Sequence, residues 1–178
     1  MSKHYQYSST HVNVPEPLAS DLCGWSGRLT EQELFQDAED ASYGRERVPH
    51  VTILYGLYST NPDSVREYLL DTEPFEVRLG SVAAFKNCKF DVLKIDVESE
   101  GLKNLHEKLT ENCGFYFNYP CYKPHITIAY LRCGMTMPYE GNVIFEGKSF
   151  IAREVVFSSR NGGASVIPLG ASVVDYCV

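Results

Sequence analysis

Long apolar runs are missing from this sequence. No stretch approaches the roughly 18 to 20 apolar residues that a membrane-spanning helix requires. The opening residues, MSKHYQYSST, also lack the basic and then apolar pattern of a secretion signal. These absences predict a cytoplasmic protein that has no membrane partner.

Basic residues are scarce. Sixteen Lys and Arg stand against 23 Asp and Glu, which gives a net charge of −7 and a pI near 5.2. This balance argues against a long nucleic acid held through a broad phosphate-tracking surface. It leaves room for a small anionic ligand in a local pocket.

Metal-binding cysteine patterns are missing as well. The six cysteines form no CxxC pair and no zinc-knuckle spacing. A chain of 178 residues does not need disulfides to fold. We therefore expect free, mostly buried thiols and no metal.

Length and composition fit a single folded unit. The chain has 44% hydrophobic and 22% charged residues, close to average globular usage. We expect one domain over 1–178, built of two intertwined lobes.

Hydrophobic periodicity predicts an α+β fold in which helices pack against antiparallel strands. A capping box formed by Thr30 and Glu33 predicts a short helix through Phe35, and Ser99 is expected to cap a helix that Gly114 closes. The expected strands cover 6–14, 48–57, 75–82, 90–97, 123–131, 148–158 and 165–169, and the expected helices cover 18–25, 30–35, 61–69 and 99–113.

A short repeat stands out. The segment PHVTILY at 49–55 returns as PHITIAY at 124–130, identical at five of seven positions. The chance expectation for such a pair in this chain is about one in a hundred or less. The offset of 125 − 50 = 75 residues suggests one equivalent strand in each half of the chain.

Alternation along a strand places His50 and Thr52 on one face, about 6 to 7 Å apart, and His125 and Thr127 likewise. The remaining motif residues are expected on the opposite face, packed against helices. They are Val51, Ile53 and Tyr55 in the first copy and Ile126, Ile128 and Tyr130 in the second.

Two His-x-Thr pairs that face each other suit chemistry at a phosphodiester. One imidazole takes a proton from the attacking oxygen and the other gives one to the leaving oxygen, since histidine titrates near neutral pH. The threonine hydroxyls would hold the non-bridging oxygens. The sequence predicts His50, Thr52, His125 and Thr127 as catalytic and leaves open which histidine is the acid. His106 is expected to pack in the core, and His11, outside the repeat, has no predicted role.

These motifs resemble the 2H phosphoesterases, a family with two His-x-Thr or His-x-Ser motifs on related strands. Further matches, such as YSST at 7–10 and EVVFSS at 154–159, resemble a phage branch that contains anti-CBASS phosphodiesterases, which open cyclic nucleotide immune signals. The resemblance implies a bilobal fold of two pseudo-symmetric antiparallel lobes around a central cleft, metal-independent chemistry without a cofactor and, for a viral source, the host cytoplasm. By position it suggests Tyr7 and Glu154 as polar contacts to phosphate or ribose and Phe85 as a base-stacking platform.

The leading hypothesis is therefore a phosphodiesterase that cleaves small cyclic oligonucleotides and needs no obligate protein partner. One alternative is an RNA 2′,3′-cyclic phosphodiesterase or 2′,5′-RNA ligase-like enzyme that uses the same four residues. A second is a module that sequesters a nucleotide without cleaving it. A histidine-triad hydrolase is disfavoured because neither copy continues as His-x-His-x-His, and a zinc hydrolase because neither motif adds a third ligand.

Overall fold

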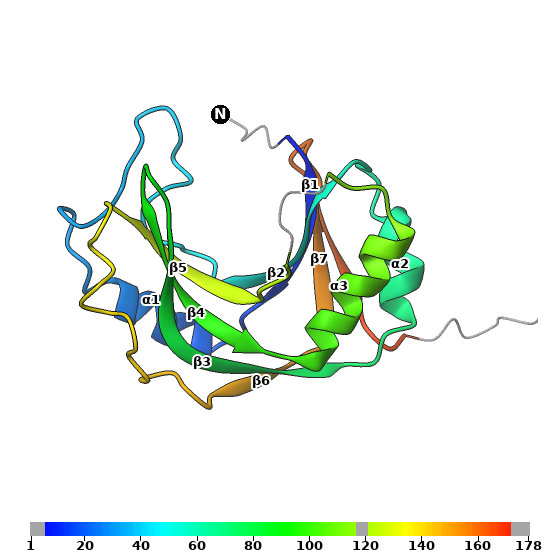
Figure 1. Cartoon of the computed structure of the whole chain (residues 1–178). Helices are drawn as coiled ribbons and strands as arrows, with labels where there is room; N and C mark the ends of the chain where they lie inside the picture. The colour runs from blue at the N-terminus through cyan, green and yellow to red at the C-terminus, as the bar shows by residue number, and fades with distance from the viewer. Residues whose placement is uncertain (1–5, 117–120, 172–178) are drawn as a thin grey trace, which may run out of the picture.

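The computed structural model describes residues 6–116 and 121–171. In this part of the chain, one antiparallel sheet of eight strands curls into a half-barrel accompanied by three helices (Figure 1). The elements in chain order are β1 (Ser8–Asn13), α1 (Leu18–Ser26), β2 (His50–Leu57), α2 (Asp63–Leu70), β3 (Phe75–Lys86), β4 (Asp91–Glu98), α3 (Glu100–Asn112), β5 (His125–Leu131), β6 (Ser149–Ala152), β7 (Glu154–Ser158) and β8 (Ala164–Pro168).

The strand order divides the sheet into two halves of four strands. It runs β6-β3-β4-β5 and continues as β2-β1-β7-β8. The halves meet where Val51 of β2 pairs with Ile126 of β5, which are the central residues of the two His-x-Thr motifs. The predicted α+β fold with two related antiparallel lobes is confirmed, and the two lobes are the halves of one continuous sheet.

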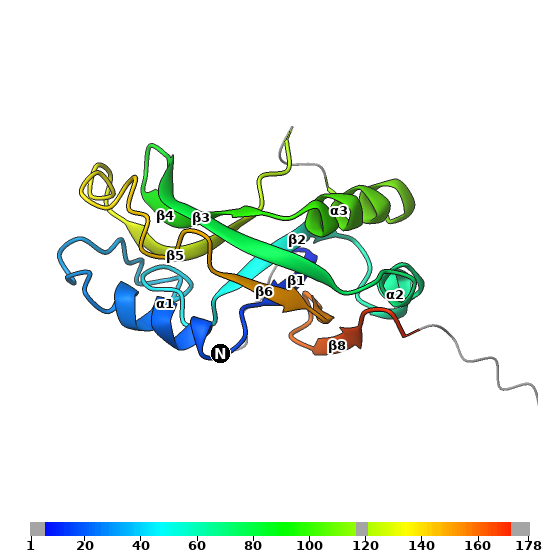
Figure 2. The ribbon, with the colours of Figure 1, turned by 90° about the horizontal axis from the view of Figure 1, so that it is seen from below.

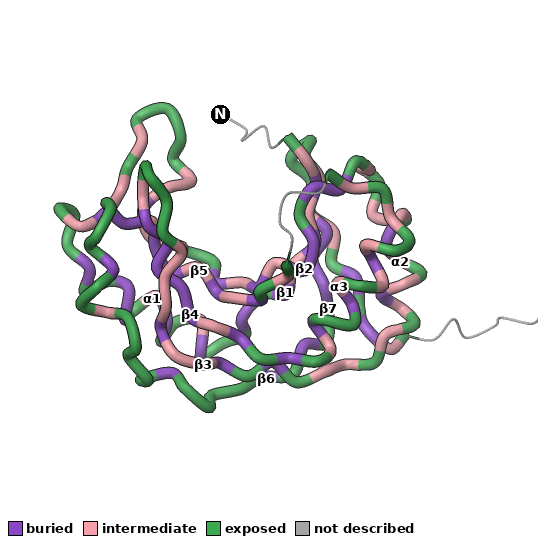
Figure 3. The backbone as a smooth tube through the Cα atoms, viewed as in Figure 1, coloured by how far each residue is buried: buried purple, intermediate pink, exposed green. Residues whose placement is uncertain are grey.

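The helices pack on the convex face of the sheet (Figures 1 and 2). The apolar face of α1 is buried against β5, and α3 buries its apolar face against β2 and β3. The predicted cap of α3 forms, because the Ser99 hydroxyl accepts a hydrogen bond from the Leu102 N–H at 3.3 Å. The helix ends at Asn112, two residues before Gly114. Along β1, β6 and the first part of β5, buried positions alternate with less buried ones (Figure 3), whereas β4 is buried along most of its length. The less buried positions near the centre of the sheet form its concave face.

Both motif strands lose their alternation at the same place. His11 of β1 pairs with Thr52 but Thr10 pairs with Leu54, so β2 holds one extra residue at Ile53. In β5 the same shift falls at Ile128, between Thr127 and Ala129. An extra residue of this kind reverses the faces of the residues that follow it.

The shift overturns the expected orientation of two motif tyrosines. Tyr55 pairs with Ser9, and Tyr130 pairs with Val92, so both turn to the concave side. Tyr55 is 39% exposed instead of buried under a helix. Simple period-2 counting was wrong here because it has no provision for an inserted residue.

Beyond the Val51–Ile126 pair, β2 and β5 no longer pair with each other. Near its end, β2 is bonded to the segment that precedes β5, and β5 is bonded to the segment that precedes β2. The Tyr116 N–H donates to Gly56 O at 2.8 Å, and the Glu46 N–H donates to Ile128 O at 2.9 Å. Gly56 has φ +103°, and a Cβ there would lie 2.6 Å from Tyr116 O, so only glycine fits this crossing. The exchange interlocks the two halves of the sheet.

Two further expectations differ from the structure. The predicted strand 148–158 is two strands that part at Arg153: β6 pairs with β3 on one edge, and β7 pairs with β1 in the other half. The Thr30 N–H and hydroxyl both reach Glu33 Oε2 at 2.7 Å. No helix follows, because Leu34 forms a bridge to Leu131 of β5.

The five described cysteines are free, as predicted, but they are not buried. Cys88, Cys121 and Cys133 are exposed and the other two are half-buried. All five lie outside the sheet strands: Cys23 lies in α1, Cys113 follows α3, and the other three lie in loops. Cys177 lies outside the described residues.

Candidate active site

The two His-x-Thr motifs lie side by side at the centre of the sheet. Because Val51 pairs with Ile126 in antiparallel register, His50 stands opposite Thr127 and Thr52 opposite His125. Val51 and Ile126 are fully buried, so the four polar side chains share the concave face. Directly opposite residues have Cβ atoms about 4.5 to 5.5 Å apart and diagonal ones about 7 to 8 Å. The structure thus brings together all four residues predicted to be catalytic, with the two histidines on one diagonal.

Both imidazoles are oriented by the same local contact. His50 Nδ1 lies 2.8 Å from Val48 O, and His125 Nδ1 lies 2.7 Å from Lys123 O. A carbonyl oxygen can only accept, so Nδ1 carries the hydrogen in each ring. In the neutral form Nε2 then keeps its lone pair, and each ring is ready to accept a proton at that atom.

Polar side chains of the flanking strands extend the motifs into two rows across the concave face. Register pairs join β1 to β2 and β4 to β5, and the β2–β5 pair joins the two halves. The first row is His11, Thr52, His125 and Asp96; the second is Asn13, His50, Thr127 and Lys94. The two rows correspond to each other when the halves of the sheet are exchanged. His11 opposite Thr52 in one half then corresponds to Lys94 opposite Thr127 in the other.

His11 is a third imidazole of this site. Its ring centroid lies 4.8 Å from that of His50. Burial, and secondly the nearby His50, lower the pKa of His11 from 6.5 to about 4, so His11 is neutral at pH 7. Sequence reasoning missed it because it lies in no repeat. Its strand position, two residues before the end of β1, becomes informative only through the pairing with Thr52.

His125 is half-buried and packs against an aromatic ring. The Phe85 and His125 rings form a T-shaped contact, with centroids 4.9 Å apart and planes at 88°. Burial is the main cause that lowers the pKa of His125, and the Lys94 ammonium lowers it further. The hydrogen bond to Lys123 O acts in the opposite direction. Burial therefore favours the neutral, proton-accepting form of His125.

Phe85, Tyr7 and Glu154 take different places. Phe85 packs inside the site against His125, so its predicted role as a base platform stays a prediction. Tyr7 lies just before β1 and stacks on Tyr116, with centroids 5.3 Å apart, at the far end of β2 from His50. Glu154 is exposed at the start of β7, two residues before Val156, which pairs with His11. The described contacts join neither Tyr7 nor Glu154 to the histidines and threonines of the two motifs.

His106 supports the site from the convex side. Its Nδ1 donates to Ile53 O at 2.7 Å, and its ring stacks on that of Tyr122 at 4.1 Å. The Tyr122 hydroxyl donates to Thr52 O at 2.9 Å. Burial raises the pKa of Tyr122, so its hydroxyl keeps its proton. The packing role expected for His106 is extended by a hydrogen bond to the extra residue of β2.

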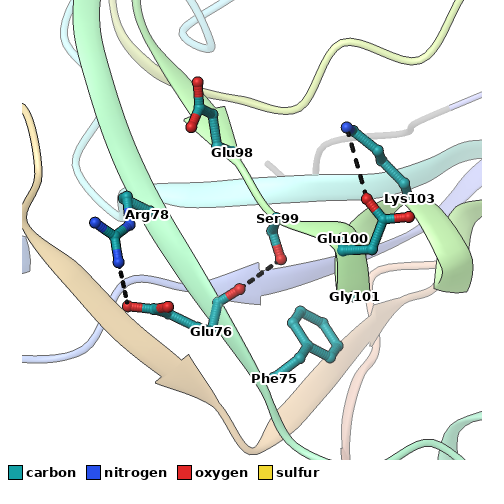
Figure 4. Close-up of a pocket in the computed structure, with 8 residues that line it drawn as sticks. All are labelled: Phe75, Glu76, Arg78, Glu98, Ser99, Glu100, Gly101 and Lys103. Carbon is teal, nitrogen blue, oxygen red and sulfur yellow. Dashed lines mark hydrogen bonds and ion pairs between the residues drawn. The ribbon is translucent and has the colours of Figure 1, made fainter.

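A separate depression lies where α3 begins beside β3 (Figure 4). Its polar groups are satisfied locally: Ser99 Oγ donates to Glu76 O at 2.6 Å, and Arg78 pairs with the Glu76 carboxylate at 3.3 Å. The predicted site residues line no part of it.

Two features are absent from the described part of the chain. Within 6–116 and 121–171, no helix is long and apolar enough to cross a membrane. The same ranges hold no group of three or more His, Cys, Asp or Glu side chains arranged to hold a metal ion.

A curled antiparallel sheet with two His-x-Thr pairs on adjacent central strands defines the 2H phosphoesterase class of proteins. The family model described as the 2′-5′ RNA ligase superfamily matches residues 18–140, more than half of the chain. The chain belongs to this superfamily.

Solved structures share the fold at low sequence identity. The protein TT0787 of Thermus thermophilus is 17% identical, with a TM-score of 0.66 over 94% of this chain and 100% of that one. E. coli LigT complexed with 3′-AMP is 17% identical, with a TM-score of 0.56 over 92% and 95%. Kluyveromyces marxianus Usb1 with uridine monophosphate is 10% identical, with a TM-score of 0.54 over 92% and 98%. No curated protein sequence matches the chain.

Proposed function

We propose that this protein is a phosphodiesterase for small nucleotides, with cyclic di- and trinucleotide second messengers as its favoured substrates. The observation that carries the proposal is the antiparallel pairing of Val51 with Ile126, which sets two His-x-Thr pairs next to each other. The family supports phosphodiester chemistry. The likeness of the sequence to the phage anti-CBASS branch supports the cyclic substrate.

The reaction needs two proton transfers. The nucleophile is either a ribose 2′-hydroxyl or water. One imidazole takes its proton while the oxygen of the nucleophile forms a bond to phosphorus. The bond from phosphorus to the leaving ribose oxygen breaks, and the other imidazole, protonated, gives that oxygen its proton. Either ring can serve as the base, because Nδ1 donates to a backbone carbonyl in both and leaves the Nε2 lone pair free. Thr52 and Thr127 donate to the non-bridging oxygens.

The charge of the molecule supports a small substrate. A net charge of −7 repels a long polyanion, whereas a short nucleotide can be held by a few local groups. The proposal includes no cofactor and no obligate protein partner, and it places the enzyme in the cytoplasm.

A second candidate is favoured by the matched family. The 2′-5′ RNA ligase superfamily is named for chemistry on RNA ends, and one similar structure, E. coli LigT, is described with 3′-AMP. A 2′,3′-cyclic phosphodiesterase or 2′,5′-ligase-like enzyme would use the same four residues.

One experiment separates the candidates. The protein is incubated in EDTA with cyclic dinucleotides, cyclic trinucleotides, 2′,3′-cyclic mononucleotides and 2′,5′-linked dinucleotides, beside a His50→Ala, His125→Ala double variant, and products are read by mass. We expect cleavage of the cyclic oligonucleotides by the unmodified protein alone. Cleavage of only the cyclic mononucleotides or 2′,5′-linked compounds would move the function to RNA ends. Equal retention of a nucleotide by both proteins, without cleavage, would mean a sequestering module.

A further inference from the structure

A buried lysine lies in the centre of the concave face. Lys94 occupies the middle of β4 and is 5% exposed. Its neighbours Leu93 and Ile95 are fully buried on the convex face, so alternation points Lys94 to the side of the histidines. Lysine is almost never buried in this way unless it is paired.

The register places Lys94 directly opposite Thr127, and Asp96 opposite His125. The other half of the sheet repeats the arrangement, because His11 pairs with Thr52. A nitrogen-bearing side chain, the neutral His11 or the charged Lys94, stands opposite each motif threonine in two halves of otherwise different sequence. This is an independent sign that the position belongs to the site.

The ammonium is held in place from two sides. Lys94 Nζ forms an ion pair with Asp96 Oδ1, and it lies 4.5 Å from the centroid of the Phe85 ring, within cation–π range. The side chain of Asp96 is 51% exposed, against 6% for that of Lys94. Water therefore screens the carboxylate more than the ammonium. The electrostatic potential beside Thr127 is then set mainly by the positive charge of Lys94.

Stability alone gives little reason to keep this pair. Buried ion pairs replaced by well-packed apolar residues often leave stability unchanged or higher, because desolvation offsets the attraction. The Phe85 ring already packs against Lys94, so a methionine of similar length would have an apolar partner there.

We propose that Lys94 is a positioning residue of this site, whose buried ammonium supplies a fixed positive charge beside Thr127 and His125 that attracts and orients the phosphodiester. The inference rests on the proposed function and adds to it the group that receives the negative charge of the substrate. A phosphoryl group between the two histidines meets donors from both threonines and the field of Lys94.

The same charge acts on His125. The charged and titratable groups that face this imidazole are Lys94 and Asp96 from β4 and His50 from β2, while β3 contributes the apolar Phe85. Lys94 and His50 lower the pKa of His125, and Asp96 raises it. Removal of Lys94 and removal of Asp96 should therefore move the titration of His125 in opposite directions.

The test compares Lys94→Met, Lys94→Arg and Asp96→Asn. We expect Lys94→Met to lower kcat/KM at pH 7 by at least about tenfold, less than the roughly 10² to 10³ lost with a donor that touches the reacting group. Lys94→Arg should recover most of this loss. Asp96→Asn breaks the same ion pair but keeps the cation, so its kcat/KM should fall less than that of Lys94→Met.

Two measurements that need no catalytic turnover test the role of Lys94 independently of the proposed function. The His125 ring proton is titrated by NMR in each variant, and binding of inorganic phosphate is measured by calorimetry. The pKa of His125 should rise in Lys94→Met and fall in Asp96→Asn, and phosphate should bind more weakly only to Lys94→Met. Equal losses in both variants, or shifts of His125 in the same direction, would assign the pair to structure alone and overturn the proposal. If the unmodified protein cleaves nothing in the panel, the proposed function fails while these two measurements still decide the role of Lys94.

Discussion

At the scale of single residues, the threonines have a task that their hydroxyl alone performs. Thr52 and Thr127 stand opposite the histidines of the other motif, where each can donate to a phosphate oxygen. Valine has the same shape without the donor. We expect Thr52→Val and Thr127→Val each to lower kcat by roughly 10² to 10³ with the fold unchanged, measured by steady-state kinetics on whichever substrate the panel identifies. Thr→Ser at the same positions should recover most of the rate, and a serine as slow as the valine would contradict the hydroxyl role.

His11 gives a prediction about acid stability. Its pKa is lowered to about 4 by burial and by His50, so between pH 6.5 and pH 4 the unfolded chain binds a proton that the folded chain does not. Stability is therefore lost as pH falls through this window, on the order of 1 to 2 kcal/mol for a partly buried ring. Urea unfolding at pH 7 and pH 5 should show a smaller drop for His11→Asn than for the unmodified protein. An equal drop in both proteins would exclude His11 as the source.

The sequence identified the four motif residues because they occur twice in the same context. It contained no signal for His11 or Lys94, since neither belongs to a repeated motif. Their importance comes from neighbours that lie 41 and 33 residues away in sequence, Thr52 and Thr127, and only the register of the sheet shows these pairs.

At the scale of elements, the extra residue of β2 depends on side chains from elsewhere. The Tyr122 hydroxyl donates to Thr52 O at 2.9 Å, and His106 Nδ1 donates to Ile53 O at 2.7 Å. These bonds satisfy two backbone carbonyls next to the interruption of the strand pairing. In β5 the backbone N–H of Glu46 donates a hydrogen bond to Ile128 O instead. The two halves thus hold the same irregularity by different means.

We expect Tyr122→Phe to lower the free energy of unfolding by about 1 kcal/mol and to lower kcat as well, because Thr52 loses its support. The matched control is Tyr139→Phe, which removes a hydroxyl that donates to Glu33 Oε1 at 2.6 Å away from the motifs. It should lose stability and keep kcat. The measurements are urea unfolding and initial rates; a similar change of kcat in both variants would show that Tyr122 acts on stability only.

Irregularities in strand pairing explain which features of the strands the sequence predicts wrongly. Most strands and the three helices were found, since apolar periodicity depends on burial alone. Tyr55 and Tyr130 were assigned to the wrong face because an inserted residue leaves the local pattern intact. The break at Arg153 was missed because β6 and β7 are both strand-like, and their separation is set by partners in opposite halves of the sheet.

At the scale of the whole molecule, the candidate site exists only where the two halves of the sheet meet. Each half carries one His-x-Thr pair, one nitrogen-bearing side chain opposite its threonine and one polar residue opposite its histidine. Neither half alone provides both a proton acceptor and a proton donor. The meeting point at Val51 and Ile126 therefore controls the geometry of the reaction as well as the continuity of the sheet.

This dependence can be tested with two equally buried isoleucines. Ile126 lies at the meeting point, and Ile167 lies in β8 at the edge of one half; both are fully buried. Truncation to alanine should cost about 2 to 5 kcal/mol at either site, measured by urea unfolding. At a temperature where both variants remain folded, Ile126→Ala should also lose activity, because the cavity lets the two motifs shift relative to each other, and a misplacement of about 1 Å can cost 10²-fold in rate. Ile167→Ala should keep kcat near that of the unmodified protein. If the two variants lose stability and activity in the same proportion, the junction of the halves has no special part in aligning the histidines.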